Sequence, residues 1–233
     1  MKVMVIDTAL GACVAGVFTG EAYAAPPYAL GVRAEVMAKG HQERLGGLAR
    51  DAAAEAGGFG GIDRIGVTVG PGSFTGLRVG LAFALGLGAA LDRPVVGVST
   101  LDALAASAPI GGLVAAVIDA RRGQVYARLF RDGAPLGEAE ALPLEIARDR
   151  ILAAAAGDAR STLIGSGAAL LAETFPELAG AVLYPLSAPT PEAVAALTLA
   201  ADPATSPTQP LYLRAPDATP PSRLPGQPRQ PAA

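Results

Sequence analysis

The sequence predicts an α/β protein made of two similar lobes. Over residues 1–202, short runs rich in valine and isoleucine alternate with longer segments that carry apolar residues at helical spacing. The predicted order of elements in the first half, βββαβαβ, recurs in the second half. Five identical residues also recur at a constant offset of 112 positions. They are Ile6, Asp7, Gly11, Ala15 and Phe18 in the first half, and Ile118, Asp119, Gly123, Ala127 and Phe130 in the second.

The first half is predicted to hold five strands and two helices. Pro26-Pro27 weakens its third strand, since proline cannot donate to a β-ladder. Its first helix has Leu45 and Leu48 on one side and ends at Gly57-Gly58. In chain order we expect the strands Lys2–Asp7 and Ala12–Phe18, an extended segment within 22–36, the helix His41–Ala56, the strand Arg64–Val69, the helix 73–91 and the strand Pro94–Val98.

The second half is predicted to repeat this order, which favours a duplication over chance identity in a chain so rich in alanine and glycine. A turn at Arg131-Asp132-Gly133 separates its second and third strands. We expect the strands Leu113–Asp119, Gln124–Phe130 and Ala134–Leu142, the helix Pro143–Ala156, the strand Ser161–Ile164, the helix Gly167–Thr174, the strand Val182–Tyr184 and the helix Pro191–Ala200. The predicted lobes are therefore residues 1–107 and 108–202.

Prolines become frequent after Asp202, and periodic patterns end there. We expect residues 203–214 to pack on the lobes as an extended segment. Residues 215–233 are predicted to form a disordered proline-rich tail.

The composition argues against several functions. A net charge of -3 and a pI near 5.2 disfavour a dedicated nucleic-acid surface. One cysteine and one histidine exclude an internal disulfide and a His/Cys zinc site within the chain. The first residues lack the layout of a secretory signal, so we expect a cytoplasmic protein. The apolar segment 74–91 contains Thr75 and Arg78, which favours a buried or interface helix over a membrane span.

The helix predicted at 73–91 carries a small residue at every fourth position. Residues four apart share one helix face, and each interior glycine costs about 1 kcal/mol of helix stability relative to alanine. Another surface must therefore approach this face closely, or a ligand must lie at the helix N-terminus. The residues are Gly72, Gly76, Gly80, Ala84 and Gly88.

Two aspartates end predicted strands at equivalent places in the repeat. In actin-like and sugar-kinase-like folds, such strand–Asp–turn elements face each other across a cleft and bind nucleotide phosphates and Mg²⁺. The alternative is an Asx turn, in which the carboxylate accepts hydrogen bonds from nearby backbone N–H groups. Both interpretations stay open, and the candidate nucleotide-binding residues are Asp7, Thr8, Gly11, Asp119 and Gly123.

The glycine-rich turn before the helix at 73–91 resembles a phosphate cradle, because a helix N-terminus favours anions. However, the Walker A lysine is missing, and Pro71 removes a backbone donor. The spacing of Gly70, Gly72 and Gly76 is one residue too long for the dinucleotide fingerprint. A Rossmann cofactor site is therefore disfavoured, and Ser73 or Thr75 is predicted to be an ordinary helix cap.

Five blocks of the sequence together resemble the TsaB family, also called YeaZ. They stay in order over residues 2–214, and the glycine-rich block is highly specific for the family. The blocks are Ile6–Thr8, Gly70–Gly80, Gly97–Ala105, Ile118–Tyr126 and Leu211–Arg214. The resemblance implies a bacterial cytoplasmic protein with a two-lobed actin/Hsp70/sugar-kinase fold, in which each lobe is ribonuclease H-like.

The resemblance also implies a role in making threonylcarbamoyladenosine at position 37, next to the anticodon, in tRNAs that read codons beginning with A. TsaD, a paralogue, transfers the threonylcarbamoyl group from threonylcarbamoyl-AMP. TsaB is its non-catalytic partner, and the small ATPase TsaE joins a ternary complex. We therefore expect a heterodimer with TsaD, contact with tRNA through the complex, no membrane, and a homodimer when TsaD is absent. No cofactor is expected, although weak binding of ATP or ADP with Mg²⁺ stays open.

The residues themselves favour the non-catalytic interpretation. TsaD carries two metal-binding histidines after the equivalent helix, and the matching positions here are Thr100 and Leu104. We expect TsaD to dock on the first lobe through the small-residue face, joined by Leu45 and Leu48. One alternative is a Mg-ATP-dependent transferase or hydrolase that uses Asp7 and Asp119. A second is a direct tRNA binder that uses Arg121, Arg122 and the arginines of the proline-rich tail.

Overall fold

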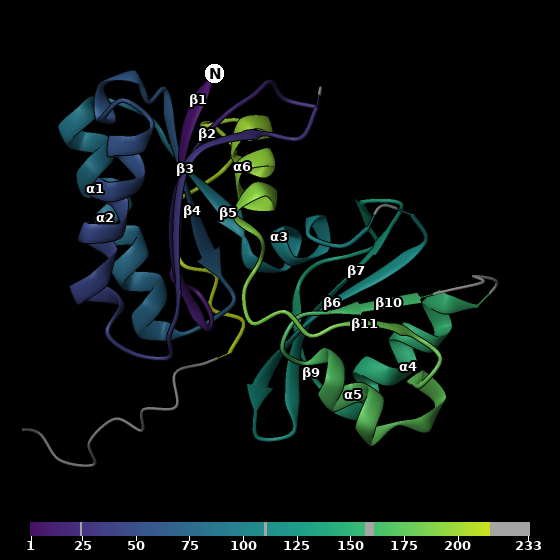
Figure 1. Cartoon of the computed structure of the whole chain (residues 1–233). Helices are drawn as coiled ribbons and strands as arrows, with labels where there is room; N and C mark the ends of the chain where they lie inside the picture. Colours follow the sequence, from purple (N-terminus) through teal and green to yellow (C-terminus); the bar gives the residue numbers. More distant parts are fainter. Residues whose placement is uncertain (24, 110, 157–160, 215–233) are drawn as a thin grey trace, which may run out of the picture.

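The protein has two lobes, each built around one β-sheet (Figure 1). The computed structural model describes residues 1–23, 25–109, 111–156 and 161–214. The predicted disordered tail, residues 215–233, lies outside these described residues.

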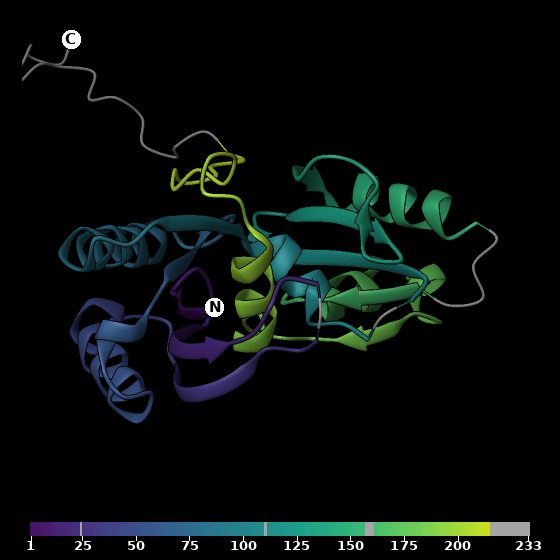
Figure 2. The ribbon, with the colours of Figure 1, turned by 90° about the horizontal axis from the view of Figure 1, so that it is seen from above.

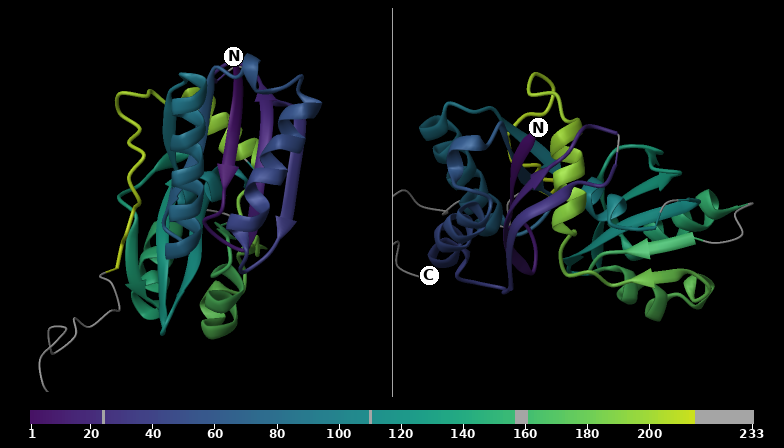
Figure 3. Two further views of the ribbon diagram at one scale, coloured as in Figure 1. Left: turned by 90° about the vertical axis from the view of Figure 1, so that its left-hand side faces the viewer. Right: turned by 45° about the horizontal axis from the view of Figure 1, so that its top comes forward.

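The first lobe forms where buried strands alternate with helices along the chain. Its elements are β1 (Lys2–Asp7), β2 (Ala12–Thr19), β3 (Tyr28–Val36), α1 (His41–Glu55), the 3-10 turn η1 (Phe59–Gly61), β4 (Arg64–Gly70), α2 (Phe74–Leu91), β5 (Val95–Ser99) and α3 (Thr100–Ala106). The sheet order is β3-β2-β1-β4-β5, with β1, β4 and β5 parallel and β2 and β3 antiparallel. Helices α1 and α2 lie side by side over one face of this sheet (Figure 3).

The second lobe follows from Leu113 onward. Its elements are β6 (Leu113–Arg121), β7 (Gln124–Arg131), β8 (Ala134–Pro135), β9 (Glu140–Pro143), α4 (Leu144–Ala155), β10 (Ser161–Ile164), α5 (Ala168–Thr174), the 3-10 turn η2 (Pro176–Leu178) and β11 (Val182–Tyr184). The sheet order is β11-β10-β6-β7-β8, and β9 also pairs with β7. The single strand predicted at 134–142 is wrong: two short strands pair with β7 at separate places, and the chain between them belongs to neither.

The two sheets share one topology, which confirms the predicted fold class. In the first lobe, β1 pairs antiparallel with β2 and parallel with β4. In the second lobe, β6 pairs antiparallel with β7 and parallel with β10. The repeated aspartates occupy equivalent places, because Asp7 pairs with Val14 and Asp119 with Val125 near the ends of their hairpins.

Helix α6 (Pro191–Ala200) returns to the first lobe, so the prediction that residues 108–202 form one unit is wrong. The helix packs between the lobes on the face of the first sheet opposite α1 and α2 (Figure 2). A Cβ on Gly66 of β4 would overlap with the side chain of Thr198, so this close packing requires glycine. The guanidinium of Arg64 donates to the carbonyl oxygens of Thr198 and Leu199, where positive charge suits a helix C-terminus.

The segment after α6, residues 203–214, is called the C-terminal strap below. Its Ser206 carbonyl accepts from the N–H of Gly97, and its Leu211 N–H donates to the carbonyl of Val69. At its end, Arg214 donates to the carbonyl of Ala120 in the second lobe. The strap therefore follows the first lobe and reaches the second.

Candidate functional site

The small-residue face of α2 is filled by the chain's own first lobe. A Cβ added to Gly76 would overlap with the backbone oxygen of Thr8, and one added to Gly80 with the Thr8 hydroxyl. At the other end of the helix, a Cβ on Gly88 would overlap with the Val95 side chain. The prediction of a close approach is confirmed, but the approaching surface is the β1–β2 turn and the sheet.

The remaining residues predicted for partner binding are also packed inside the lobe. Ala84, Leu45 and Leu48 are buried in the core between the helices and the sheet. A Cβ on Gly72 would overlap with the carbonyl of Ala9. The assignment of these residues to a partner surface is therefore wrong, because their contacts are made within the chain.

The opposite face of α2 is apolar and exposed. Phe74 and Leu85 are 50% and 45% exposed, and Ala82, Gly86 and Ala89 lie on the same outer side. The charged residue among them is Arg78. Sequence analysis missed this face, although the large apolar residues of the helix recur at positions other than those of the glycines. By length and composition, α2 is apolar enough to cross a membrane, but its glycine face packs on the sheet.

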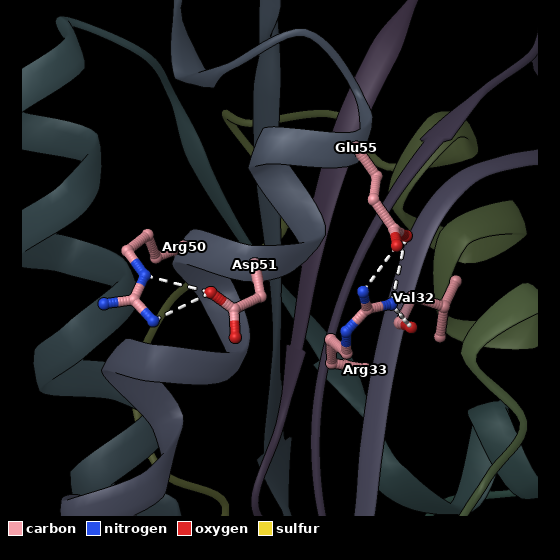
Figure 4. A network of polar contacts seen from close by, with 5 residues as sticks. All are labelled: Val32, Arg33, Arg50, Asp51 and Glu55. Carbon is pink, nitrogen blue, oxygen red and sulfur yellow. Dashed lines mark hydrogen bonds and ion pairs between the residues drawn. The ribbon is translucent and has the colours of Figure 1, made fainter.

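Charged residues border the exposed helices on the β3 side. Arg33 on β3 forms an ion pair with Glu55 on α1, and it also donates to the carbonyl of Val32 (Figure 4). On the side of α1 away from β3, Arg50 pairs with its neighbour Asp51. The Arg33 guanidinium holds the pKa of the Glu55 carboxyl below its usual value. Surface ion pairs of this kind contribute little to stability. Their charged side chains make the surface of α1 polar on both of these sides.

Asp7, the first candidate for phosphate chemistry, is buried at the end of β1 with 1% of its surface exposed. Its Oδ1 accepts hydrogen bonds from the Ala9 N–H at 2.9 Å and the Thr68 hydroxyl at 2.6 Å. Its Oδ2 has no hydrogen-bond partner among the described residues. Burial raises the pKa of this carboxyl, and the two hydrogen bonds only partly oppose that effect.

The turn after Asp7 makes its polar contacts within the protein. The N–H of Gly11 donates to the carbonyl of Ser187, and the Thr8 hydroxyl donates to the carbonyl of Gly76. The carbonyl of Ala9 accepts from the N–H of Ser73, the residue that caps α2. The backbone N–H groups of Ala9 and Gly11, which could otherwise cradle a phosphate, are therefore both engaged. The first donates to Asp7 Oδ1 and the second to the carbonyl of Ser187.

Asp119, at the equivalent place in the second lobe, forms a self-contained turn. Its Oδ1 accepts from the Arg121 N–H at 2.7 Å, and its Oδ2 pairs with the Arg121 guanidinium at 3.3 Å. Arg121, Arg122 and Gly123 have φ values of 63°, 56° and 71°, as in a tight left-handed turn. The Asx turn that the sequence left open is observed here, and no hydrogen bond or ion pair joins the described atoms of Asp119 and Asp7.

Three side chains from two distant parts of the chain, α2 and the C-terminal strap, meet at the N-terminal end of α2. The Arg78 guanidinium lies 3.7 Å from the centre of the Phe74 ring, and its Nε donates to the Tyr212 hydroxyl at 3.2 Å. The rings of Phe74 and Tyr212 are 5.3 Å apart between centroids. We call these three residues the aromatic–arginine cluster. Sequence analysis missed it because Tyr212 lies on the C-terminal strap.

Two further features of the described residues are a hollow in the second lobe and the buried thiol of Cys13. A hollow of about 300 Å³ lies in the second lobe between β7, β9 and α4, and its lining includes Leu129, Leu142 and Ile151. Among the described residues, no group of three or more His, Cys, Asp or Glu side chains could hold a metal ion. Burial raises the pKa of the Cys13 thiol to about 11, which opposes thiolate chemistry there.

Comparison with known proteins agrees with this geometry. Residues 14–139, just over half of the chain, match the family model described as "TsaD: tRNA N6-adenosine threonylcarbamoyltransferase". A relative from Mycobacterium leprae is 37% identical over 222 residues, which is 94% of this chain but 56% of that protein. The tRNA threonylcarbamoyladenosine biosynthesis protein TsaB of Bacillus subtilis is 45% identical over 71 residues, 30% of this chain and 31% of that protein. The solved structure of YeaZ from Pseudomonas aeruginosa matches with a TM-score of 0.72 at 29% identity, covering 91% of this chain and 99% of that chain.

Two lobes that repeat one sheet topology define the class of the actin, Hsp70 and sugar-kinase proteins. In this chain the turn after Asp7 is hydrogen-bonded to other parts of the protein, and Asp119 is paired with Arg121. The chain belongs to the TsaD family, among its TsaB, or YeaZ, members.

Proposed function

We propose that this protein is a non-catalytic subunit in the synthesis of tRNA threonylcarbamoyladenosine, and that it binds a TsaD paralogue through the outer face of α2. The exposed apolar face of α2 is the observation that carries the proposal. Only a third of this 18-residue apolar helix is buried within the chain. A contiguous apolar surface of this kind marks an interaction site.

A paralogue is the occupant that this surface fits best. The family model described as TsaD spans residues 14–139, which include both α1 and α2. A TsaD partner therefore has helices at equivalent places, and two similar helix pairs can meet in a pseudo-symmetric interface. The same logic makes a homodimer the expected form when TsaD is absent.

The filled nucleotide turns support the non-catalytic role. Asp7 is buried, and the N–H groups of Ala9 and Gly11 are already bonded within the chain. Thr100 and Leu104, which we expect at the positions of the metal-binding histidines of TsaD, are both buried within α3. Catalysis then belongs to TsaD, with TsaE joining as the ATPase and tRNA contacted through the assembled complex.

The test is a charge placed in the middle of the exposed face. Leu85→Glu is expected to lower affinity for the TsaD of the same organism by about 100-fold, because a buried interfacial carboxylate has no partner. Ile146→Glu on α4 is the matched control, since Ile146 is 43% exposed on the other lobe. Calorimetry measures binding, and nucleoside analysis of tRNA from complemented cells measures threonylcarbamoyladenosine.

Unchanged TsaD affinity in a folded Leu85→Glu variant would refute the surface assignment. Normal threonylcarbamoyladenosine after depletion of the protein would refute the pathway. Binding of Mg-ATP by the isolated chain, lost in Asp7→Asn, would instead favour the transferase or hydrolase alternative.

A further inference from the structure

The aromatic–arginine cluster is held in place from two independent elements. Phe74 and Arg78 stand one turn apart on α2, so the helix sets their spacing. Tyr212 is positioned by the C-terminal strap, which bonds to Val69 through its neighbour Leu211 and to Ala120 through Arg214. The cluster is therefore preorganised before any partner arrives.

The cluster is also exposed and continues the α2 face. Phe74 is 50% exposed and Tyr212 is 45% exposed, although both rings are large and apolar. Leu85 and Ala82 extend the same outer side of the helix toward its other end. Aromatic residues and arginine are the types most enriched where truncation weakens protein–protein binding.

Arg78 retains hydrogen-bonding capacity that the described part of the chain does not use. Its Nε donates to the Tyr212 hydroxyl, while its terminal nitrogens have no partner among the described residues. A guanidinium presents these N–H groups as a planar fork that matches a carboxylate. Because the guanidinium lies over the Phe74 ring, that ring face is already covered and is not open to a nucleic-acid base.

We infer that the aromatic–arginine cluster is the strongest contact of the α2 docking surface, that the C-terminal strap is part of this surface through Tyr212, and that the protein partner supplies a carboxylate to Arg78. This inference rests on the proposed function and specifies which residues dominate it. The partner chemistry is an apolar helix face with an Asp or Glu at one end.

The experiment measures calorimetric affinity for the TsaD paralogue with full-length variants. Arg78→Glu is expected to weaken binding by about 300-fold, more than Leu85→Glu, since it sets two carboxylates against each other at the strongest contact. Tyr212→Ala is expected to weaken it by about tenfold, and Tyr212→Phe by less, because the ring remains. Arg121→Glu, an exposed charge reversal on the other lobe, is the matched control and should leave the affinity unchanged.

A charge exchange identifies the partner group. Replacing one Asp or Glu of TsaD at a time by Arg should yield a variant that restores the affinity of Arg78→Glu at least tenfold. If Leu85→Glu loses TsaD but Arg78→Glu and Tyr212→Ala bind normally, this inference fails while the proposed function stands. If all three bind normally, the proposed function fails as well.

Nucleic-acid recognition is the other outcome that the same variants reveal. If Arg78→Glu and Arg121→Glu leave TsaD binding intact but both weaken tRNA binding in a salt-dependent manner, the cluster belongs to an RNA surface. That result would overturn the inference.

Discussion

The two faces of α2 have opposite roles, although they belong to one helix of nearly uniform apolar composition. On one face Gly76 and Gly80 lie so close to Thr8 that no side chain fits between them. On the other, a Cβ at Gly86 would meet open space, and Leu85 is nearly half exposed. The inner face is packed against the rest of the lobe, and the outer face is the surface that we propose for a partner.

This difference shows how a glycine pattern in a helix should be interpreted. Glycines at every fourth position require a close neighbour, because helix stability is lost at each of them. They do not say whether that neighbour lies within the chain or outside it. In this protein the neighbour is the turn after Asp7. The exposed side chains of Phe74 and Leu85 are therefore better indicators of a partner surface than the glycines.

The largest change in stability is expected when one methyl group is added to the inner face. Gly76→Ala should destabilise the protein by about 3 kcal/mol, because the Cβ would overlap with the backbone oxygen of Thr8, which cannot rotate away. Urea denaturation of the full chain measures the free energy of unfolding. A Gly76→Ala variant as stable as the parent would show that Gly76 and the backbone of Thr8 are not in close contact.

A smaller change in stability is expected for Asp7→Asn, at the turn against which the inner face packs. Burial raises the pKa of Asp7 above 3.8, so the folded state holds a proton that the unfolded chain releases as the pH rises past that value. The parent therefore loses stability above about pH 4 until Asp7 ionises in the folded state as well. Asp7→Asn removes this loss while its amide oxygen still accepts from Ala9 and Thr68.

Melting temperatures of the Asp7→Asn variant and the parent, recorded from pH 3 to pH 8, measure this effect. The variant should melt higher at pH 7, and the difference should shrink toward pH 3. A variant that is less stable at pH 7 would indicate an ionised Asp7 with a partner that the structure does not record.

On the outer face, Gly86→Ala has the opposite sign to Gly76→Ala. It should stabilise the protein by about 0.5–1 kcal/mol, since the added Cβ meets nothing and alanine favours the helix. Thermal and urea unfolding of both variants side by side provide the contrast. Equal destabilisation by the two substitutions would mean that both faces are packed.

The smallest change in stability is expected for Leu85→Glu. Because Leu85 is largely outside the core, its replacement should alter the free energy of unfolding by about 0.5 kcal/mol or less. The same variant should lose TsaD, so stability and binding separate on this face. A strongly destabilised Leu85→Glu would show that the outer face also supports the fold.

Much of the fold could be predicted because its signals are local. The strand Lys2–Asp7 was predicted with the bounds observed, and α1, β4 and α6 begin at the predicted residues. The repeated hairpins were visible because matching residues recur in the same order. The lobe that receives α6 was not predictable from periodicity, since an apolar helix fits either sheet until Thr198 meets Gly66.

The candidate site was predicted only in part. The Asp7 and Asp119 turns were located correctly, but sequence could not distinguish a buried carboxylate from a solvated one. The aromatic–arginine cluster had no sequence signal of its own, because the whole second lobe lies between Phe74 and Tyr212 in the chain. The exposed side of α2 was not predicted as a contact surface, because the glycine spacing indicated a close contact on the opposite side.

By itself, the sequence determined the elements, their duplicated order and the need for a surface close to the α2 glycines, because these depend on residues near each other in the chain. Tertiary structure alone decided that Thr8 supplies that surface, that α6 joins the first lobe and that Tyr212 reaches Arg78. Each of these contacts joins residues far apart in sequence. Their geometry depends on how the two sheets and the strap pack, which no local pattern encodes.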